Sequence, residues 1–187
     1  MTSRHSDSLV LAWQVAAAEA RHLRSPQIEP HHLLLGLCKL IDLDIIALVS
    51  KTSPNRDVVL EELLREVRRL RDVFRNSGFD PKILRRKLRR AYGKDSLEAI
   101  DSEPLRRSER AKEVFLMAEK WGDVTHLVVF PVHLLYAVLN IEDVRRDSVI
   151  AGLGFDKDKL IRNAKNEIFL REGIDAKRKA ARKIARN

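Results

Sequence analysis

Apolar residues recur at spacings of three and four along most of the chain, which is the pattern of helices that bury one face. After a capping triplet, Ser6-Asp7-Ser8, this spacing runs from Leu9 to Leu23. Pro30 suits the first position of a second helix, because its missing N–H would be unpaired there anyway. Further apolar stretches predict a short element over 44–49 and helices over 57–76, 80–91, 108–121, 131–140, around Ser148, and over 156–170.

The two halves of the chain repeat each other. EPHHLLLGL, residues 29–37, aligns with FPVHLLYAV, residues 130–138, at an offset of 101 that also aligns Ala17 with Ala118. Further on, Gly78-Phe79-Asp80 aligns with Gly154-Phe155-Asp156 at an offset of 76. The difference of 25 residues indicates an insertion in the first half. The sequence therefore predicts an all-α fold of pseudo-two-fold duplicated four-helix repeats, with an inserted long helix in the first repeat.

These offsets divide one domain, 1–187, into parts. Strand pairs are not expected, and Leu127-Val128-Val129 is interpreted as a short extended piece before Pro131. The parts are repeat 1 over 6–92 with its insertion at 42–77, a polar linker over 93–107, repeat 2 over 108–171, and a basic tail over 172–187.

Composition supports a helical protein of the cytoplasm. Leu, Ala, Arg, Lys and Glu dominate, and aromatic residues make up only 5%. The single cysteine, Cys38, lies in an apolar run and is expected in the core rather than in a disulfide. The longest uncharged run, 124–141, has 18 residues but contains Pro131 and two histidines, so no membrane span is expected.

Positive charge is concentrated in two segments. Residues 65–90 hold eleven basic and three acidic residues, and 174–187 hold six basic and one acidic. The rest of the chain carries a net charge of −4, within a total of +9. A generally nucleic-acid-binding surface is therefore disfavoured. The alternative hypothesis is a basic helical protein that binds nucleic acid or an anionic surface through 65–90.

The chain lacks the sequence patterns of common catalytic sites. It has no Gly-x-x-x-x-Gly-Lys-[Ser/Thr] loop, no Gly-x-Ser-x-Gly turn and no His-Glu-x-x-His helix. His32 and His133 each fall near a helix start, where the ring is expected to hydrogen-bond the neighbouring turn rather than bind a metal. No catalytic residue, metal or cofactor is predicted, and the chain is not expected to be an enzyme.

A duplicated, ordered set of short segments resembles the Clp N-terminal (double-repeat) domain. That module is found at the front of Clp/Hsp100 AAA+ unfoldases and in standalone Clp accessory proteins. The resemblance implies a non-catalytic module that docks substrates or adaptors, with an AAA+ unfoldase, a Clp peptidase, an adaptor protein and unfolded protein segments as partners. The matching segments are Ala16-Ala17-Ala18-Glu19-Ala20, His32-Leu33-Leu34-Leu35-Gly36-Leu37, Gly78-Phe79-Asp80, Ala118-Glu119, His133-Leu134-Leu135 and Gly154-Phe155-Asp156.

The resemblance also suggests a groove between the repeats, at the starts of the two equivalent helices. Glu29, His31, Phe130 and Val132 are expected to face this groove and to bind protein segments. In family members that recognise phosphorylated arginine, a Glu precedes each histidine. Here those positions are His31 and Val132, so phosphoarginine recognition is not carried over.

The inserted helix is expected to supply a second interaction surface. Its apolar stripe is longer than one small repeat needs, and the arginines opposite are expected to repel one another at spacings of three and four. An acidic partner would relieve that repulsion. This predicted partner-binding basic face consists of Arg65, Arg68, Arg69, Arg71 and Arg75.

Overall fold

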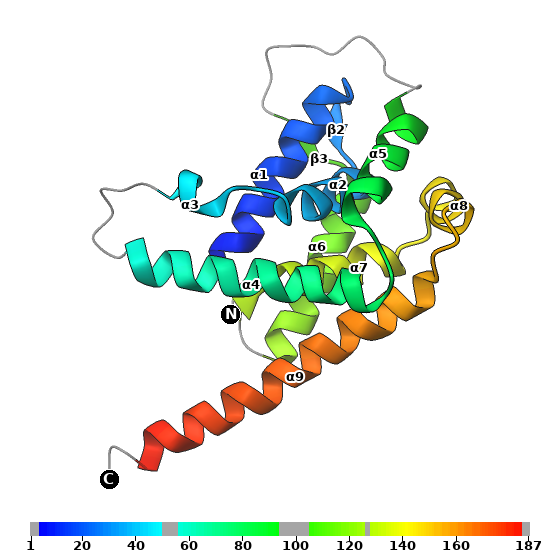
Figure 1. Ribbon diagram of the computed structural model, residues 1–187. Coiled ribbons are helices and arrows are strands. Elements are labelled where there is room, and N and C mark those ends of the chain that lie inside the picture. The colour runs from blue at the N-terminus through cyan, green and yellow to red at the C-terminus, as the bar shows by residue number, and fades with distance from the viewer. Residues whose placement is uncertain (1–3, 50–55, 94–104, 126–127, 185–187) are drawn as a thin grey trace.

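The computed structural model describes residues 4–49, 56–93, 105–125 and 128–184, and the predicted all-α duplicated fold is confirmed (Figure 1). The helices are α1 Asp7–His22, α2 Pro30–Leu40, α3 Ile45–Leu48, α4 Arg56–Asn76, α5 Pro81–Tyr92, α6 Glu109–Thr125, α7 Pro131–Asn140, α8 Val144–Gly152 and α9 Lys157–Ile184. Four two-residue strands accompany them: β1 Arg4–His5, β2 Gln27–Ile28, β3 Arg106–Arg107 and β4 Val128–Val129.

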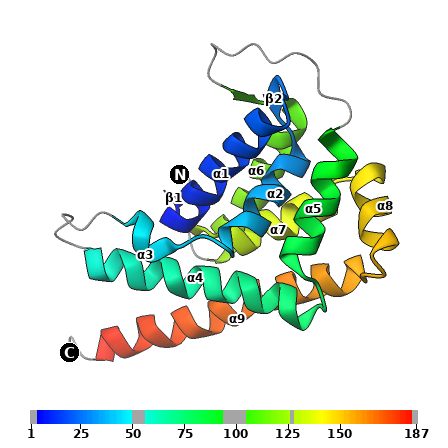
Figure 2. The ribbon, with the colours of Figure 1, turned by 45° about the horizontal axis from the view of Figure 1, so that its top comes forward.

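The two short helices α2 and α7 form the centre of the molecule. They contact each other, α1 packs on α2, and α6 and α9 pack on α7, while α4 and α9 lie side by side along one end (Figures 1 and 2). In α2 every side chain except His31 and Lys39 is buried. In α7 only Tyr136 and Asn140 are not buried. Both helices therefore lie in the core on nearly all sides.

His32 and His133 occupy equivalent places at the starts of these central helices. The Nδ1 atom of His32 accepts a hydrogen bond from the backbone N–H of Glu29 at 2.9 Å, and His133 accepts one from the N–H of Phe130 at 2.9 Å. Both rings are fully buried. The predicted bond from each ring to its neighbouring turn is confirmed, and the match supports the repeat.

The repeats exchange short strands, which the sequence did not predict. β1 precedes α1 and pairs in parallel with β4 of repeat 2, while β3 precedes α6 and pairs in parallel with β2 of repeat 1. The exchange continues into the helix caps, because the N–H of Ser6 bonds to the Val129 carbonyl and the N–H of Ser108 to the Ile28 carbonyl. In each repeat, the strand before the central helix thus pairs with a strand that the other repeat supplies.

This exchange corrects the alignment of the first helix in each repeat. Ser6 and Ser108 make equivalent bonds, so the offset there is 102 rather than 101. Buried Ala118 corresponds to buried Ala16, and the predicted match with the half-buried Ala17 is wrong by one residue. The offset of 101 holds from β2 through the central helix α2, because repeat 1 has one extra residue between α1 and β2.

The second predicted alignment is confirmed by backbone geometry. Gly78 and Gly154 both have positive φ, at 81° and 70°, and the residue after each bonds back to the helix that precedes it. The end of α4 therefore corresponds to α8, and the fully buried Phe74 corresponds to Ile150. The inserted helix was expected to lie outside the shared core, but its C-terminal turns belong to that core and its N-terminal turns are the addition.

Two predicted boundaries also change. The last helix was expected to end at Leu170 with a separate basic tail after it, but α9 continues to Ile184. This extension contains no proline, and its Ala, Lys and Arg residues favour helix. In the predicted linker 93–107, Gly93 caps α5 and Arg106–Arg107 form β3, while 94–104 lie outside the described residues.

The contact between α1 and α2 depends on Gly36. A Cβ atom there would lie 2.6 Å from the Ala12 carbonyl oxygen and 2.9 Å from the Ala16 nitrogen. We expect Gly36→Ala to lower the free energy of unfolding by about 1–3 kcal/mol, because both contacts are backbone atoms that cannot move aside. Denaturant unfolding measures this. Gly152→Ala is the control, since no atom lies within 4 Å of its Cβ position, and an equal loss in both variants would contradict the prediction.

The start of α2 also holds two histidines in their neutral form. Burial, and then the positive charge of Arg145, lower the pKa of His31 to about 3. Burial, and then His31, lower the pKa of His32 to about 3. Because His32 accepts a hydrogen bond at Nδ1, protonation of that atom would place two donors against each other.

The free energy of unfolding should therefore depend on pH. Between pH 3 and 6.5 the unfolded chain binds more protons than the folded chain, so stability is complete above about 6.5 and falls as the pH drops. From pH 7 to pH 5 we expect a loss of about 1–2 kcal/mol for each ring. His31→Phe keeps a ring against Tyr92, and it should remove about half of this loss in denaturant titrations. An unchanged pH dependence in that variant would contradict the assignment.

Candidate functional site

The four predicted groove residues lie against different elements. Glu29 accepts a hydrogen bond from the Ser108 hydroxyl at 2.8 Å, and the His31 ring stacks on Tyr92 of α5 with centroids 3.7 Å apart. Phe130 and Val132 line a cavity of only about 10 Å³ beneath Glu66 and Arg69 of α4. The described contacts do not bring the two pairs together, and their joint role in binding stays a prediction.

The five predicted arginines of α4 are mostly engaged within the fold. Arg65 pairs with Glu61 at 2.6 Å and Arg75 with Asp72 at 2.9 Å, both on α4 itself. The remaining contacts are Arg69 with Glu167 of α9 at 3.7 Å and Arg71 with the Ile41 carbonyl at 2.9 Å, while Arg68 is exposed. Carboxylates within the fold therefore offset the charge of three of the five arginines, and the binding of a partner by this face stays a prediction.

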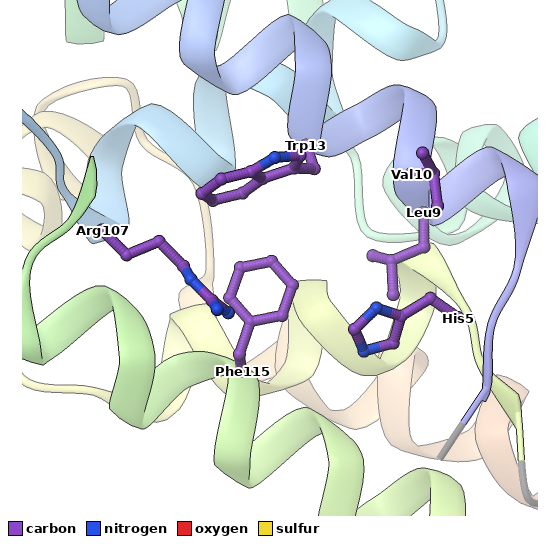
Figure 3. Close-up of a pocket in the computed structure, with 6 residues that line it drawn as sticks. All are labelled: His5, Leu9, Val10, Trp13, Arg107 and Phe115. Carbon is purple, nitrogen blue, oxygen red and sulfur yellow. The ribbon is translucent and has the colours of Figure 1, made fainter. Parts of the chain in front are cut away.

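An open pocket between the repeats is lined by none of the predicted groove residues or α4 arginines. It has a volume of about 200 Å³ and is formed by the start of repeat 1, by β3 and by α6, as Figure 3 shows. The Trp13 and Phe115 rings meet edge to face, with centroids 5.4 Å apart. The lining residues are His5, Leu9, Val10, Trp13, Arg107 and Phe115.

The pocket lies where equivalent positions of the two repeats meet. Trp13 follows the capping Ser6 by seven residues, and Phe115 follows Ser108 by the same number. His5 and Arg107 immediately precede those serines and are therefore also equivalent. Figure 3 shows the two rings between Arg107 at one end and His5 at the other. The pocket thus straddles the pseudo-two-fold axis.

A basic side chain borders each end of the apolar surface. The Arg107 guanidinium lies 5.4 Å from the Trp13 centroid and 5.0 Å from the Phe115 centroid, within the range of cation–π attraction. His5 Nε2 lies 3.1 Å from a Glu119 oxygen. Leu9 and Phe115 form a buried floor, whereas Val10 is 42% exposed. The pocket can therefore hold an apolar side chain and offer hydrogen-bond donors to the groups that flank it.

Sequence reasoning missed this pocket although a signal existed. Aromatic residues are scarce, and one follows each capping serine by seven residues. The alignment error of one residue hid this match, because it placed Trp13 opposite Val114. The offset of 102 became evident only from the strand exchange. Each of these strands has only two residues, which is too short to detect in the sequence.

Other kinds of site find little support in the described part of the chain. No group of three or more His, Cys, Asp or Glu side chains there is arranged to hold a metal ion. None of the helices described combines the length and apolar character needed to cross a bilayer. Cys38 is fully buried, and burial raises the pKa of its thiol well above the usual range, so a reactive thiolate is disfavoured.

Comparisons with known proteins identify the fold. No protein-family model matches the chain, and no curated protein sequence matches it. Solved structures do match, at low sequence identity. The Hsp104 N-terminal domain from Candida albicans has a TM-score of 0.58 and 15% identity, over 86% of this chain and 89% of that one.

Two further structures agree with this match. A protein from a malarial protein secretion system has a TM-score of 0.61 and 14% identity, over 88% of this chain and 95% of that one. The N-terminal domain of the caseinolytic protease associated chaperone ClpD from Arabidopsis thaliana has a TM-score of 0.59 and 17% identity, over 90% of this chain and 96% of that one. The resemblance in sequence therefore extends to three dimensions, and the chain has the fold of a Clp/Hsp100 N-terminal domain.

Proposed function

We propose that the chain is a non-catalytic docking module of a Clp/Hsp100 protein-unfolding or proteolysis system, and that the pocket at Trp13 and Phe115 binds segments of substrate or adaptor proteins. The observation that carries this proposal is the aromatic pair on the pseudo-two-fold axis. The half-buried Trp13 ring, which the buried Phe115 ring supports edge to face, supplies contact area at the open pocket with little loss of side-chain entropy. The fold of the chain is the one that such modules use.

The pocket suits unfolded segments better than one fixed ligand. Its floor is apolar, so an exposed apolar side chain gains free energy by leaving water there. Folded proteins bury their apolar residues, which favours unfolded chains and exposed adaptor segments as ligands. An AAA+ unfoldase or a Clp peptidase is then the partner that acts on the bound protein, and we expect this to occur in the cytoplasm.

Tryptophan fluorescence tests the proposal directly. The chain has two tryptophans, so Trp121→Phe leaves Trp13 as the single reporter in the pocket. Titration with a reduced, carboxymethylated protein, which cannot fold, should shift the Trp13 emission to shorter wavelength and saturate. Because the binding is mainly apolar, it should change little between low and physiological salt.

Matched substitutions on α6 supply the control. In the Trp121→Phe background, Phe115→Leu keeps the buried floor filled, and by removing the ring beside Trp13 it should weaken binding about tenfold. Leu116→Ala removes a neighbouring apolar side chain that is 57% exposed and does not line the pocket, and it should leave binding unchanged. Equal affinity in the Phe115→Leu and Leu116→Ala proteins would refute a docking role for the pocket.

A further inference from the structure

A second surface feature lies on α5, outside the aromatic pocket. Five basic residues follow one another at helical spacing along this helix and border a cleft of about 400 Å³. The end of α1 and Asp42 complete the cleft. The stripe extends over about 12 Å of helix, at 1.5 Å per residue. We call it the α5 stripe, and it consists of Lys82, Arg85, Arg86, Arg89 and Arg90.

The inner residues of the α5 stripe are paired within the fold. Arg89 donates two hydrogen bonds of 2.7 Å to the buried carboxylate of Glu19. Arg85 and Lys82 lie 3.8 and 3.7 Å from the oxygens of Asp42. These pairs fix α5 against repeat 1 and account for part of the charge.

The outer residues are differently placed. Arg86 and Arg90 are exposed and lie one helical turn apart, and neither forms an ion pair with any described residue. Ile83, which is 41% exposed, shares this side of the helix at spacings of three and seven from them. The exposed side of α5 therefore presents two guanidinium groups, of Arg86 and Arg90, beside the apolar side chain of Ile83.

The second repeat shows that packing does not require this charge. At the offset of 76, buried Leu84 corresponds to buried Leu160, so α5 and the start of α9 pack alike. The five positions of the α5 stripe correspond there to Asp158, Ile161, Arg162, Lys165 and Asn166, with a net charge of +1 in place of +5. The same fold thus forms with and without a basic surface.

We propose that the α5 stripe docks an acidic protein segment with at least two carboxylates one helical turn apart. Such carboxylates match the spacing of Arg86 and Arg90, since arginine forks bind carboxylates in paired geometry. Ile83 provides an apolar contact beside them. A protein is favoured over a nucleic acid because no Phe, Tyr or Trp side chain lines the cleft to stack on bases, and because the exposed Ile83 offers an apolar contact that a phosphate backbone cannot use.

Charge reversal on α5 tests this docking surface. The probe is a labelled alanine-based helical peptide with glutamates one turn apart and an isoleucine beside them, followed by fluorescence anisotropy at low salt. Arg86→Glu with Arg90→Glu should weaken its binding at least about tenfold, because attraction becomes repulsion at both positions. Both residues are exposed, so the melting temperature should stay close to that of the parent protein.

Reversing the same number of charges on α4 supplies the control. Arg68→Glu with Arg75→Glu changes two exposed arginines outside the cleft and should leave peptide binding unchanged. Equal loss in both variants would overturn the proposal, and so would tighter binding of a single-stranded or duplex DNA probe that is lost only in the α5 variant. The Trp13 response to unfolded protein should be unaffected by either variant, which separates this surface from the aromatic pocket.

Discussion

The whole fold depends on how the ends of two buried helices satisfy their backbone hydrogen bonds without water. α2 and α7 lie in the core, and a helix end in the core needs partners for its unpaired groups. At the N-terminal ends, the rings of His32 and His133 accept an N–H from the preceding residue. At the C-terminal ends, arginines donate to carbonyls: Arg71 to Ile41, and Arg146 to Val138, Leu139 and Ile141.

The two repeats meet this requirement by different means at their C-terminal ends. Arg146 is fully buried and occupies the position of buried Leu70 in repeat 1, one residue before Arg71. Its charge is balanced by Asp147, and Lys157 also contacts that carboxylate. Although partial burial opposes it, hydrogen bonds from these two basic residues lower the pKa of Asp147. Repeat 1 instead has buried Leu70 at this position, and the exposed Arg71 that follows it donates to the Ile41 carbonyl.

Much of the fold could be predicted from the sequence because the repeat is carried by residues with strong local preferences. The histidine at the third helical position and the Gly-Phe-Asp turn each fix a backbone geometry, so both alignments identified equivalent elements. The strand exchange could not be predicted, since two-residue strands have no periodicity to detect. The match between Trp13 and Phe115 in the pocket could be seen only after the strand exchange had given the correct offset for the first helix of each repeat. The pairing of Arg69 depended on Glu167 of α9, which is distant in sequence.

The reciprocal strands also constrain the order in which the chain can fold during synthesis. β1 is made first, but its partner β4 appears only after Val128 has been added. Repeat 1 therefore leaves the ribosome with the first strand and the β2 loop lacking their neighbours, and its core helix α2 lacks the cover of α7. Because each half lacks these contacts alone, we expect the two halves to fold as one cooperative unit rather than one after the other.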